Sequence, residues 1–207
     1  MSEGEHPGEH QHPGEHEHPG EHEHGREQHH EHVPYPDAVR AYRSQKDDAF
    51  RLDPNSPIPP ADRESFEGLP YFEVDPALRI EGLPLEPYRG DEPTSFQIPT
   101  TDGNLRPAER AGTFRFDVQG RSCHLTAYVF AGTHSHELFV PFQDATTGTE
   151  TYGTGRYLDL EPEADGSYSL DFNLAYHPYC VYDARYSCPL TPPENRLAVR
   201  IEAGERL

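Results

Sequence analysis

The alternation of apolar and polar positions predicts one long helix followed by a series of short strands. Between residues 37 and 50, Val39, Tyr42, Lys46 and Phe50 recur at helical spacing, and neither Gly nor Pro interrupts the segment. Pro36 stands immediately before it, where proline is favoured at the start of a helix. The spacing therefore predicts a helix over residues 37–50, the only long one in the chain.

A period of two replaces the helical period beyond a proline-rich loop at residues 53–60. Phe114, Phe116 and Val118 alternate with polar residues, and a second alternating run at residues 123–129 follows Gln119-Gly120. A short connection that contains Gly between two such runs is typical of a hairpin. Further strands are predicted at residues 136–142, 156–160, 167–173 and 196–201.

Sequential strands joined by tight turns favour antiparallel pairing. We therefore expect a mainly β fold, an antiparallel meander that closes as a barrel or sandwich, with the N-terminal helix packed outside it. An open sheet is the alternative, and it would need a helix or a partner to cover its edges.

The first 32 residues differ in composition from the rest of the chain. They hold ten of the fourteen His and nine Glu, with no Leu, Ile, Val, Phe, Tyr or Trp. The unit His-Pro-Gly-Glu-His-Glx begins at His6 and repeats at His12 and His18. Because this segment has nothing to bury, and Pro and Gly block helix and strand, we expect residues 1–33 to be a disordered tail. Residues 34–207 are then expected to form a single domain.

The tail also carries a clear ligand chemistry. Pairs of the form His-x-His can chelate Zn, Ni or Cu without folding, because neutral imidazole is a common ligand for these metals. The alternative is a solvated low-complexity tail that binds metal only on a purification column. The candidate ligands are His10, His12, His16, His18, His22 and His24.

Charge excludes several classes of partner. The chain has 37 acidic against 17 basic residues and a formal charge of -20, of which the tail contributes eight negative charges. Such a protein repels phosphate backbones, so we expect no nucleic-acid partner. No stretch approaches the ~18 apolar residues that crossing a bilayer requires, so we expect no membrane partner. The N-terminus has no apolar signal segment, which predicts a cytoplasmic protein.

The densest grouping of polar residues suggests a binding site for a small molecule. A guanidinium flanked by Tyr hydroxyls and amides suits an anionic ligand, because Arg presents a planar set of donors. The alternative is that the same side chains satisfy the backbone of loops, with no ligand involved. The candidate residues are Asp144, Arg156, Tyr157, Asp159, Asp171, Asn173, Tyr176 and Arg196.

A hydrolase-type enzyme is the second functional hypothesis. It would use Asp144, Asp159 or Asp171 as acid or base, together with a nearby imidazole. The histidines outside the tail are His124, His134, His136 and His177. No nucleophile elbow, Walker loop or dinucleotide motif supports a particular reaction.

The three cysteines leave several possibilities open. Cys123 lies on an apolar strand face, which predicts a buried thiol in the core. Cys180 and Cys188 are expected to be free thiols in a reducing compartment, but a disulfide remains an alternative. A metal site formed by His177, Cys180 and Cys188, with His124 as a fourth ligand, is the third possibility.

Two long strings in the second half resemble the signature of a known family. The first covers residues 141–159 and begins Pro-Phe-Gln-Asp-Ala-Thr-Thr-Gly; the second covers residues 171–180 and is followed by residues 188–197. Together with an upstream string at residues 66–72, they resemble domain of unknown function 1684, an uncharacterised bacterial and archaeal family, over roughly residues 38 to 207. The resemblance implies no activity, because the family has none established, and the tail lies outside it.

Overall fold

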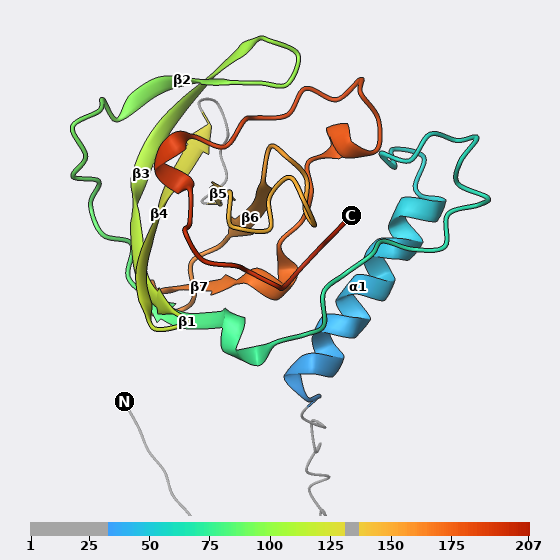
Figure 1. Cartoon of the computed structure of the whole chain (residues 1–207), viewed down its shortest axis with the longest axis horizontal. Helices are drawn as coiled ribbons and strands as arrows, with labels where there is room; N and C mark the ends of the chain where they lie inside the picture. Colours follow the sequence, from blue (N-terminus) through green and yellow to red (C-terminus); the bar gives the residue numbers. More distant parts are fainter. Residues whose placement is uncertain (1–32, 131–136) are drawn as a thin grey trace, which may run out of the picture. The chain divides into compact units, whose positions relative to one another are not determined.

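The structure is a computed structural model that describes residues 33–130 and 137–207, and residues 33–207 form one compact unit (Figure 1). The histidines of the expected tail, and also His134 and His136, lie outside the described residues. In the part of the chain that is described, no helix combines the length and the apolar composition needed to cross a bilayer.

The predicted helix is confirmed and is two residues longer at each end. Helix α1 spans Tyr35–Leu52, with Pro36 in its first turn, where the missing N–H leaves no hydrogen bond unmade. Val39, Arg43 and Phe50 are buried on one side of it. The chain becomes extended at Asp53, immediately before the proline-rich loop.

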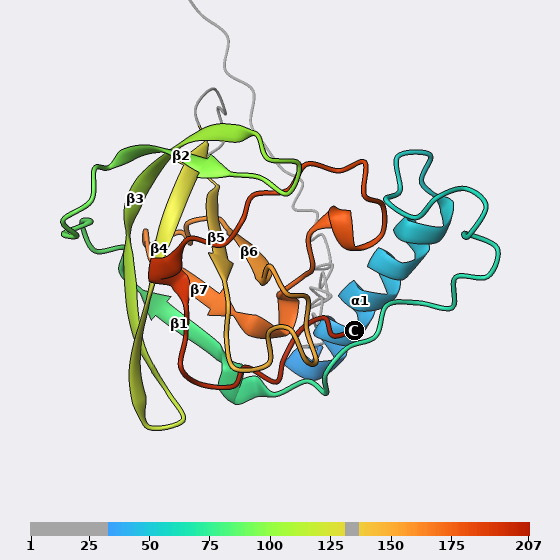
Figure 2. The ribbon, with the colours of Figure 1, turned by 45° about the horizontal axis from the view of Figure 1, so that its top comes forward.

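The strands form two antiparallel sheets (Figure 2). The larger sheet has the order β2-β3-β4-β5-β6, and the smaller pairs β1 with β7. The strands are β1 Arg79–Leu83, β2 Ser95–Pro99, β3 Leu105–Val118, β4 Arg121–Phe130, β5 Leu138–Phe142, β6 Arg156–Leu160 and β7 Tyr168–Asp171. Four short 3-10 helices complete the described part: η1 Pro76–Leu78, η2 Phe172–Leu174, η3 Tyr179–Val181 and η4 Pro193–Asn195.

The β3–β4 hairpin follows the sequence pattern closely. The two residues of its turn, Gln119 and Gly120, have φ of 52° and 71°. A two-residue turn with both φ values positive matches the right-handed twist of the flanking strands. Phe114, Phe116 and Val118 are buried as the alternation predicts.

A closed barrel is not found among the described residues. The order of the larger sheet leaves β2 and β6 as its edges. At the β6 edge, the described residues make an isolated bridge between Tyr157 and Tyr176 and no further strand pairing. The mainly β class, the antiparallel pairing and the single long helix are confirmed for this part of the chain.

The prediction of a strand at residues 196–201 is wrong. This segment bends at residues 198 and 199 and forms only one isolated bridge among the described residues, between Arg196 and Gln143. Hydrogen bonds also join it to residues 143–145: Leu197 N donates to Gln143 O, Ala145 N donates to Val199 O, and Ile201 N donates to the Asp144 carboxylate. The strand predicted at residues 167–173 ends at Asp171, where η2 begins. β1 and β2 were not predicted, because Gly82 and the flanking prolines obscure their alternation.

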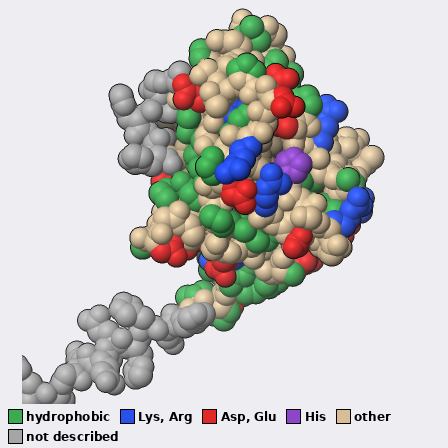
Figure 3. All heavy atoms as spheres, turned by 90° about the vertical axis from the view of Figure 1, so that its left-hand side faces the viewer, with side chains coloured by type: hydrophobic (Ala, Val, Ile, Leu, Met, Phe, Trp, Pro, Cys, Tyr) green, Lys and Arg blue, Asp and Glu red, His purple; other side chains and the backbone are tan. Residues whose placement is uncertain are grey.

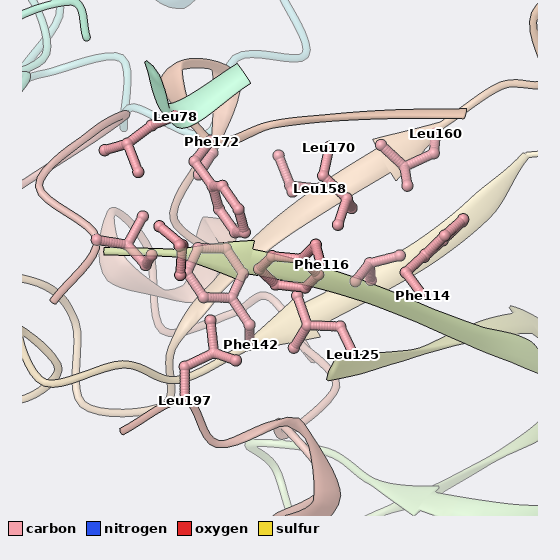
Figure 4. Packing of buried hydrophobic residues seen from close by; sticks show 14 of the residues in the cluster. Leu78, Phe114, Phe116, Leu125, Phe142, Leu158, Leu160, Leu170, Phe172 and Leu197 are labelled. Carbon is pink, nitrogen blue, oxygen red and sulfur yellow. The ribbon is translucent and has the colours of Figure 1, made fainter. Parts of the chain in front are cut away.

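The main hydrophobic core lies between the two sheets (Figure 4). Phe114, Phe116 and Leu125 from the larger sheet face Leu170 and Phe172 from the β7–η2 segment. The rings of Phe116 and Phe172 have centroids 5.8 Å apart. Full burial of one such side chain contributes roughly 1.5–3 kcal/mol, so this cluster is the main source of stability for the unit.

The opposite face of the larger sheet is also partly buried. Tyr128, Phe139 and Tyr157 form a second, aromatic cluster there, and Phe130 and Tyr176 pack against it. These residues alternate with the core residues along β4, β5 and β6, because successive side chains of a strand point to opposite faces. The sheet therefore has an aliphatic and phenylalanine core on one face and a tyrosine-rich surface on the other.

The Asn195 side chain completes the larger sheet between β4 and β5. These two strands share a single residue pair, Tyr128 with Phe139. The Asn195 amide is fully buried; its oxygen accepts from Thr126 N at 2.7 Å, and its nitrogen donates to Thr126 O and Pro141 O. One side chain thus supplies the hydrogen bonds that a continuous ladder would have made.

The outer side of the β3–β4 hairpin has charges of both signs (Figure 3). Basic side chains lie next to acidic ones there. Arg115 on β3 forms one ion pair of this kind, with Glu86 at 3.1 Å. On this face, acidic and basic groups are interspersed instead of forming one extended field of a single sign.

Candidate functional site

A cavity of about 770 Å³ lies over the aromatic face of the larger sheet. Its walls come from β3 to β6, from one side of α1 and from residues 176–189. Sites for small molecules typically measure roughly 300–1,000 Å³ and are lined mainly by apolar and aromatic side chains. The aromatic residues of the wall are Tyr42, Phe50, Tyr128, Phe130, Phe139, Tyr157, Tyr176, Tyr179 and Tyr186.

The floor of the cavity is held rigidly. The rings of Phe139 and Tyr157 meet edge to face with centroids 4.7 Å apart, and those of Tyr157 and Tyr176 are perpendicular at 5.7 Å. The Tyr157 hydroxyl donates to the Pro189 carbonyl. Ring contacts and this hydrogen bond fix the orientation of each ring, so the shape of the floor is set before any ligand arrives.

Lys46 brings a positive charge from α1 to the cavity wall. It is the only lysine of the chain, and its Nζ lies 2.7 Å from Oε1 of Glu205, a residue that is only 1% exposed. Oε2 of Glu205 accepts from the backbone N–H of His177 at 2.7 Å and from the Tyr182 hydroxyl at 3.0 Å. The charge of Lys46 is therefore already balanced within the protein.

Two carboxylates face the same cavity. Asp159 accepts a hydrogen bond from the Tyr176 hydroxyl, and its side chain is exposed to the hollow. The surrounding walls desolvate it and raise its pKa, although the Tyr176 hydroxyl and Lys46 act in the opposite direction. Desolvation, with Asp159 and Glu161 nearby, also raises the pKa of Glu137. Both groups therefore lack full compensation of their negative charge.

The eight residues predicted to bind a ligand do not form one group. Tyr157, Asp159 and Tyr176 line the cavity. Asp144, Arg156, Asp171 and Asn173 are buried, and Arg196 is exposed at the end of η4. The structure thus brings three of the predicted residues together at a hollow and places the other five elsewhere.

Arg156 is fully buried and donates hydrogen bonds to backbone carbonyls of the same chain. It is 0% exposed, and its guanidinium donates to the backbone carbonyls of Ile201, Ala203 and Glu205. Its Nη2 also donates to Oδ1 of Asp144 at 3.3 Å, and Oδ2 of Asp144 accepts from Ile201 N. These contacts match the alternative to ligand binding, in which the polar side chains satisfy backbone groups of the protein itself.

Asp171 and Asn173 join the start of α1 to the smaller sheet. The Tyr35 hydroxyl donates to both carboxylate oxygens of Asp171, at 2.7 and 2.8 Å. The Asn173 amide donates to the Asp75 carbonyl and accepts from the Asp75 N–H. A shallow hollow of about 200 Å³ contains both Asp159 and Asp171, but Asp171 is engaged by Tyr35 there.

Neither of the described histidines, His124 and His177, lines the cavity or the smaller hollow. His177 is 2% exposed, its Nε2 accepts from Tyr152 N, and burial with Arg156 and Lys46 nearby lowers its pKa to about 3. His124 is exposed on β4. Among residues 33–130 and 137–207, no three His, Cys, Asp or Glu side chains converge as a metal site would require.

The cysteines are free thiols. Cys188 is buried beside the cavity, and burial raises its pKa to about 11, while the Cys180 N–H donates to its sulfur at 3.3 Å. Cys123 is partly buried and packs against the main core. The expectation of a buried Cys123 in the core is therefore met only in part.

Several residues of the cavity were missed by sequence reasoning. Lys46, Glu137 and Arg106 line it, although they come from distant parts of the chain. The available signals were the uniqueness of Lys46 and the alternation that places Tyr128 opposite the core face of β4. Neither signal says which elements meet over the sheet.

The fold and the cavity define a class: a mainly antiparallel β domain with one covering helix and an aromatic cavity on the second face of its larger sheet. The chain belongs to the family described as Protein of unknown function (DUF1684), whose sequence profile matches residues 64–206. A comparison with curated proteins gave no match.

A solved structure is similar to this chain over most of its length. The solution NMR structure of an uncharacterized protein from Haloarcula marismortui is 40% identical in sequence, with a TM-score of 0.61. The similarity covers 83% of this chain and 93% of that one.

Replacing Arg156 by Met is expected to destabilise the unit by about 3 kcal/mol or more, because Asp144 and three carbonyls lose their buried partner. Urea unfolding would measure the change. Arg196→Met, at an exposed position, is the matched control and should cost less than about 0.5 kcal/mol. Adding Asp144→Asn to Arg156→Met should recover part of the loss, since the unpaired charge disappears. Equal stabilities of the two Arg variants would contradict this prediction.

His177 predicts a specific loss of stability in acid. The unfolded chain binds a proton at this imidazole below about pH 6.5, whereas the folded chain does so only near its pKa of about 3. Stability is therefore complete above pH 6.5 and is lost as pH falls toward 3, by up to about 1.4 kcal/mol per pH unit. His177→Gln keeps an acceptor for Tyr152 N but does not titrate. Its free energy of unfolding should fall less steeply than that of the wild type between pH 6 and 4; parallel profiles from urea titrations would disprove the assignment.

Proposed function

We propose that this protein is a small-ligand-binding module whose site is the aromatic cavity between α1 and the larger sheet. The observation that carries the proposal is the combination of a hollow of about 770 Å³ with a preformed aromatic floor and a few converging polar groups. Those groups include Asp159 and Tyr176, two of the residues for which the sequence predicted ligand binding. Few polar groups in an apolar hollow are what orient a bound molecule.

The other predicted residues contribute to this site indirectly. Arg156 and Asp144 hold the C-terminal segment that carries Glu205, and Glu205 holds Lys46 at the cavity wall. Asp171 holds the start of α1 through Tyr35. These contacts fix the positions of the elements that enclose the cavity.

The hydrolase hypothesis receives less support. An acid–base reaction needs a carboxylate and a second catalytic group within hydrogen-bond reach of one substrate. In the described part of the chain, Asp144 lies outside both hollows, and Asp171, which shares the smaller hollow with Asp159, is engaged by Tyr35. Neither His124 nor His177 lines the cavity. The binding module is therefore the stronger candidate. Its proposed location is the cytoplasm, since a reducing compartment keeps thiols such as Cys180 and Cys188 free.

We propose a separate metal-binding role for the tail. Its support is the sequence pattern alone: three His-x-His pairs within a repeat, formed by His10 with His12, His16 with His18 and His22 with His24. Zn, Ni and Cu are the candidate metals, because imidazole suits all three.

A substitution that fills the cavity tests the binding proposal. Fragments that bind the wild-type protein should raise its Tm by about 5 °C or more at about 100 times their Kd. Ala49 is exposed on α1 and lines the cavity, so Ala49→Trp should abolish these shifts. Ala41→Trp places the same ring elsewhere on α1 and should keep them. Fragments that bind both variants equally would place the site away from the cavity.

A shortened chain tests the tail. Because residues 33–207 form a compact unit, a version that begins at Val33 should fold and bind fewer Zn²⁺ ions than the full chain in a calorimetric titration at pH 7. The excess binding should vanish at about pH 5, since protonated imidazole does not ligate metal. Equal uptake by the two versions would refute the proposal.

A further inference from the structure

We infer that the cavity binds an organic cation, an ammonium group carried on an apolar body. This inference rests on the proposed function, because it names the ligand class of the same cavity. Three observations carry it: the density of aromatic rings, the cations that already lie against those rings, and two carboxylates that form no ion pair within the described part of the chain.

The aromatic wall offers a favourable environment for a positive charge. The face of an aromatic ring carries a negative partial charge and attracts ammonium and guanidinium groups. Two side chains of the protein already use this attraction. The Lys46 ammonium lies 4.8 Å from the ring centre of Tyr176, and the Arg106 guanidinium lies 3.7 Å from that of Phe130.

The carboxylates supply the complementary charge. Phe139 pairs with Asp159 across β5 and β6, and Glu137 lies two residues before Phe139, so both acids lie beside the same aromatic floor. Neither Asp159 nor Glu137 forms an ion pair with any residue that the structure describes. Desolvation is the largest cause of both raised pKa values, and the opposing effect of Lys46 on Asp159 does not outweigh it. A bound ammonium group would supply a compensating positive charge.

An anionic ligand is disfavoured by the same balance. Lys46 is bound by Glu205 at 2.7 Å and cannot offer an uncompensated charge. Arg106 remains, but an anion beside it would also face Asp159 and Glu137, with Glu161 close to Glu137. Like charges in a partly desolvated hollow repel more strongly than in water, so the net field there favours a cation.

Three probes of the same shape separate the possible ligand classes. We would titrate the full chain with 2-phenylethylamine, 2-phenylethanol and 3-phenylpropionate, which share a ring body and differ in charge, and follow the binding by NMR chemical shifts. The amine should bind about tenfold more tightly than the alcohol, as one charge-assisted hydrogen bond predicts, and the carboxylate should bind most weakly.

Matched variants locate the charge responsible. Asp159→Asn keeps an acceptor for the Tyr176 hydroxyl, so it should weaken binding of the amine about tenfold and leave binding of the alcohol unchanged. Glu137→Gln should act in the same direction. Asp117→Asn removes an exposed carboxylate at the far end of β3 and serves as the control for net charge; it should change neither affinity.

Each outcome bears on the inference. Tighter binding of the alcohol or of the carboxylate at the cavity would overturn the cation assignment and leave the proposed binding site standing. Equal effects of Asp159→Asn and Asp117→Asn would overturn it as well. If none of the three probes binds, the inference fails, and the fragment screen with the Ala49 and Ala41 variants decides the proposed function independently.

Discussion

The rest of the unit depends on the hydrogen bonds that the buried Arg156 guanidinium makes with the C-terminal segment and with Asp144. The C-terminal segment lies beside the larger sheet without joining its ladder, so its carbonyl groups need donors from a side chain. Arg156 supplies those donors, and Asp144 balances its charge at 3.3 Å while accepting from Ile201 N. Removing two charges from water costs several kcal/mol, which is recovered only when the geometry satisfies nearly every group.

That interaction reaches the cavity through Glu205. Arg156 holds the Glu205 carbonyl, and the Glu205 side chain in turn binds Lys46 on α1, the His177 backbone and the Tyr182 hydroxyl. One buried carboxylate thus joins the helix, the segment after β7 and the C-terminus. The result is a fixed distance between α1 and the aromatic face of the sheet, which keeps the cavity open and its walls in place.

Sequence periodicity predicted the elements whose partners are close along the chain. Helix α1, the β3–β4 hairpin and β6 follow from local spacing and turn residues. The segment at residues 196–201 shows where this reasoning ends: its alternation suits a strand, but its backbone partners are Asp144, Gln143 and Arg156, more than 40 residues away in sequence. Barrel closure is not confirmed for the described residues, and the sequence could not decide it, since no local pattern says whether β6 reaches another edge.

The sequence by itself determined which residues are apolar on each face of the sheet, the family of the chain and the separation of a His-rich tail from the rest. Tertiary structure alone decided that Tyr157, Asp159 and Tyr176 meet Lys46 over one hollow, while Arg156, Asp144 and Asn173 are used inside the protein. The physical reason is that a polar side chain has the same local signature whether it satisfies a distant carbonyl or faces a ligand. Only the position of the partner, set by long-range packing, distinguishes the two.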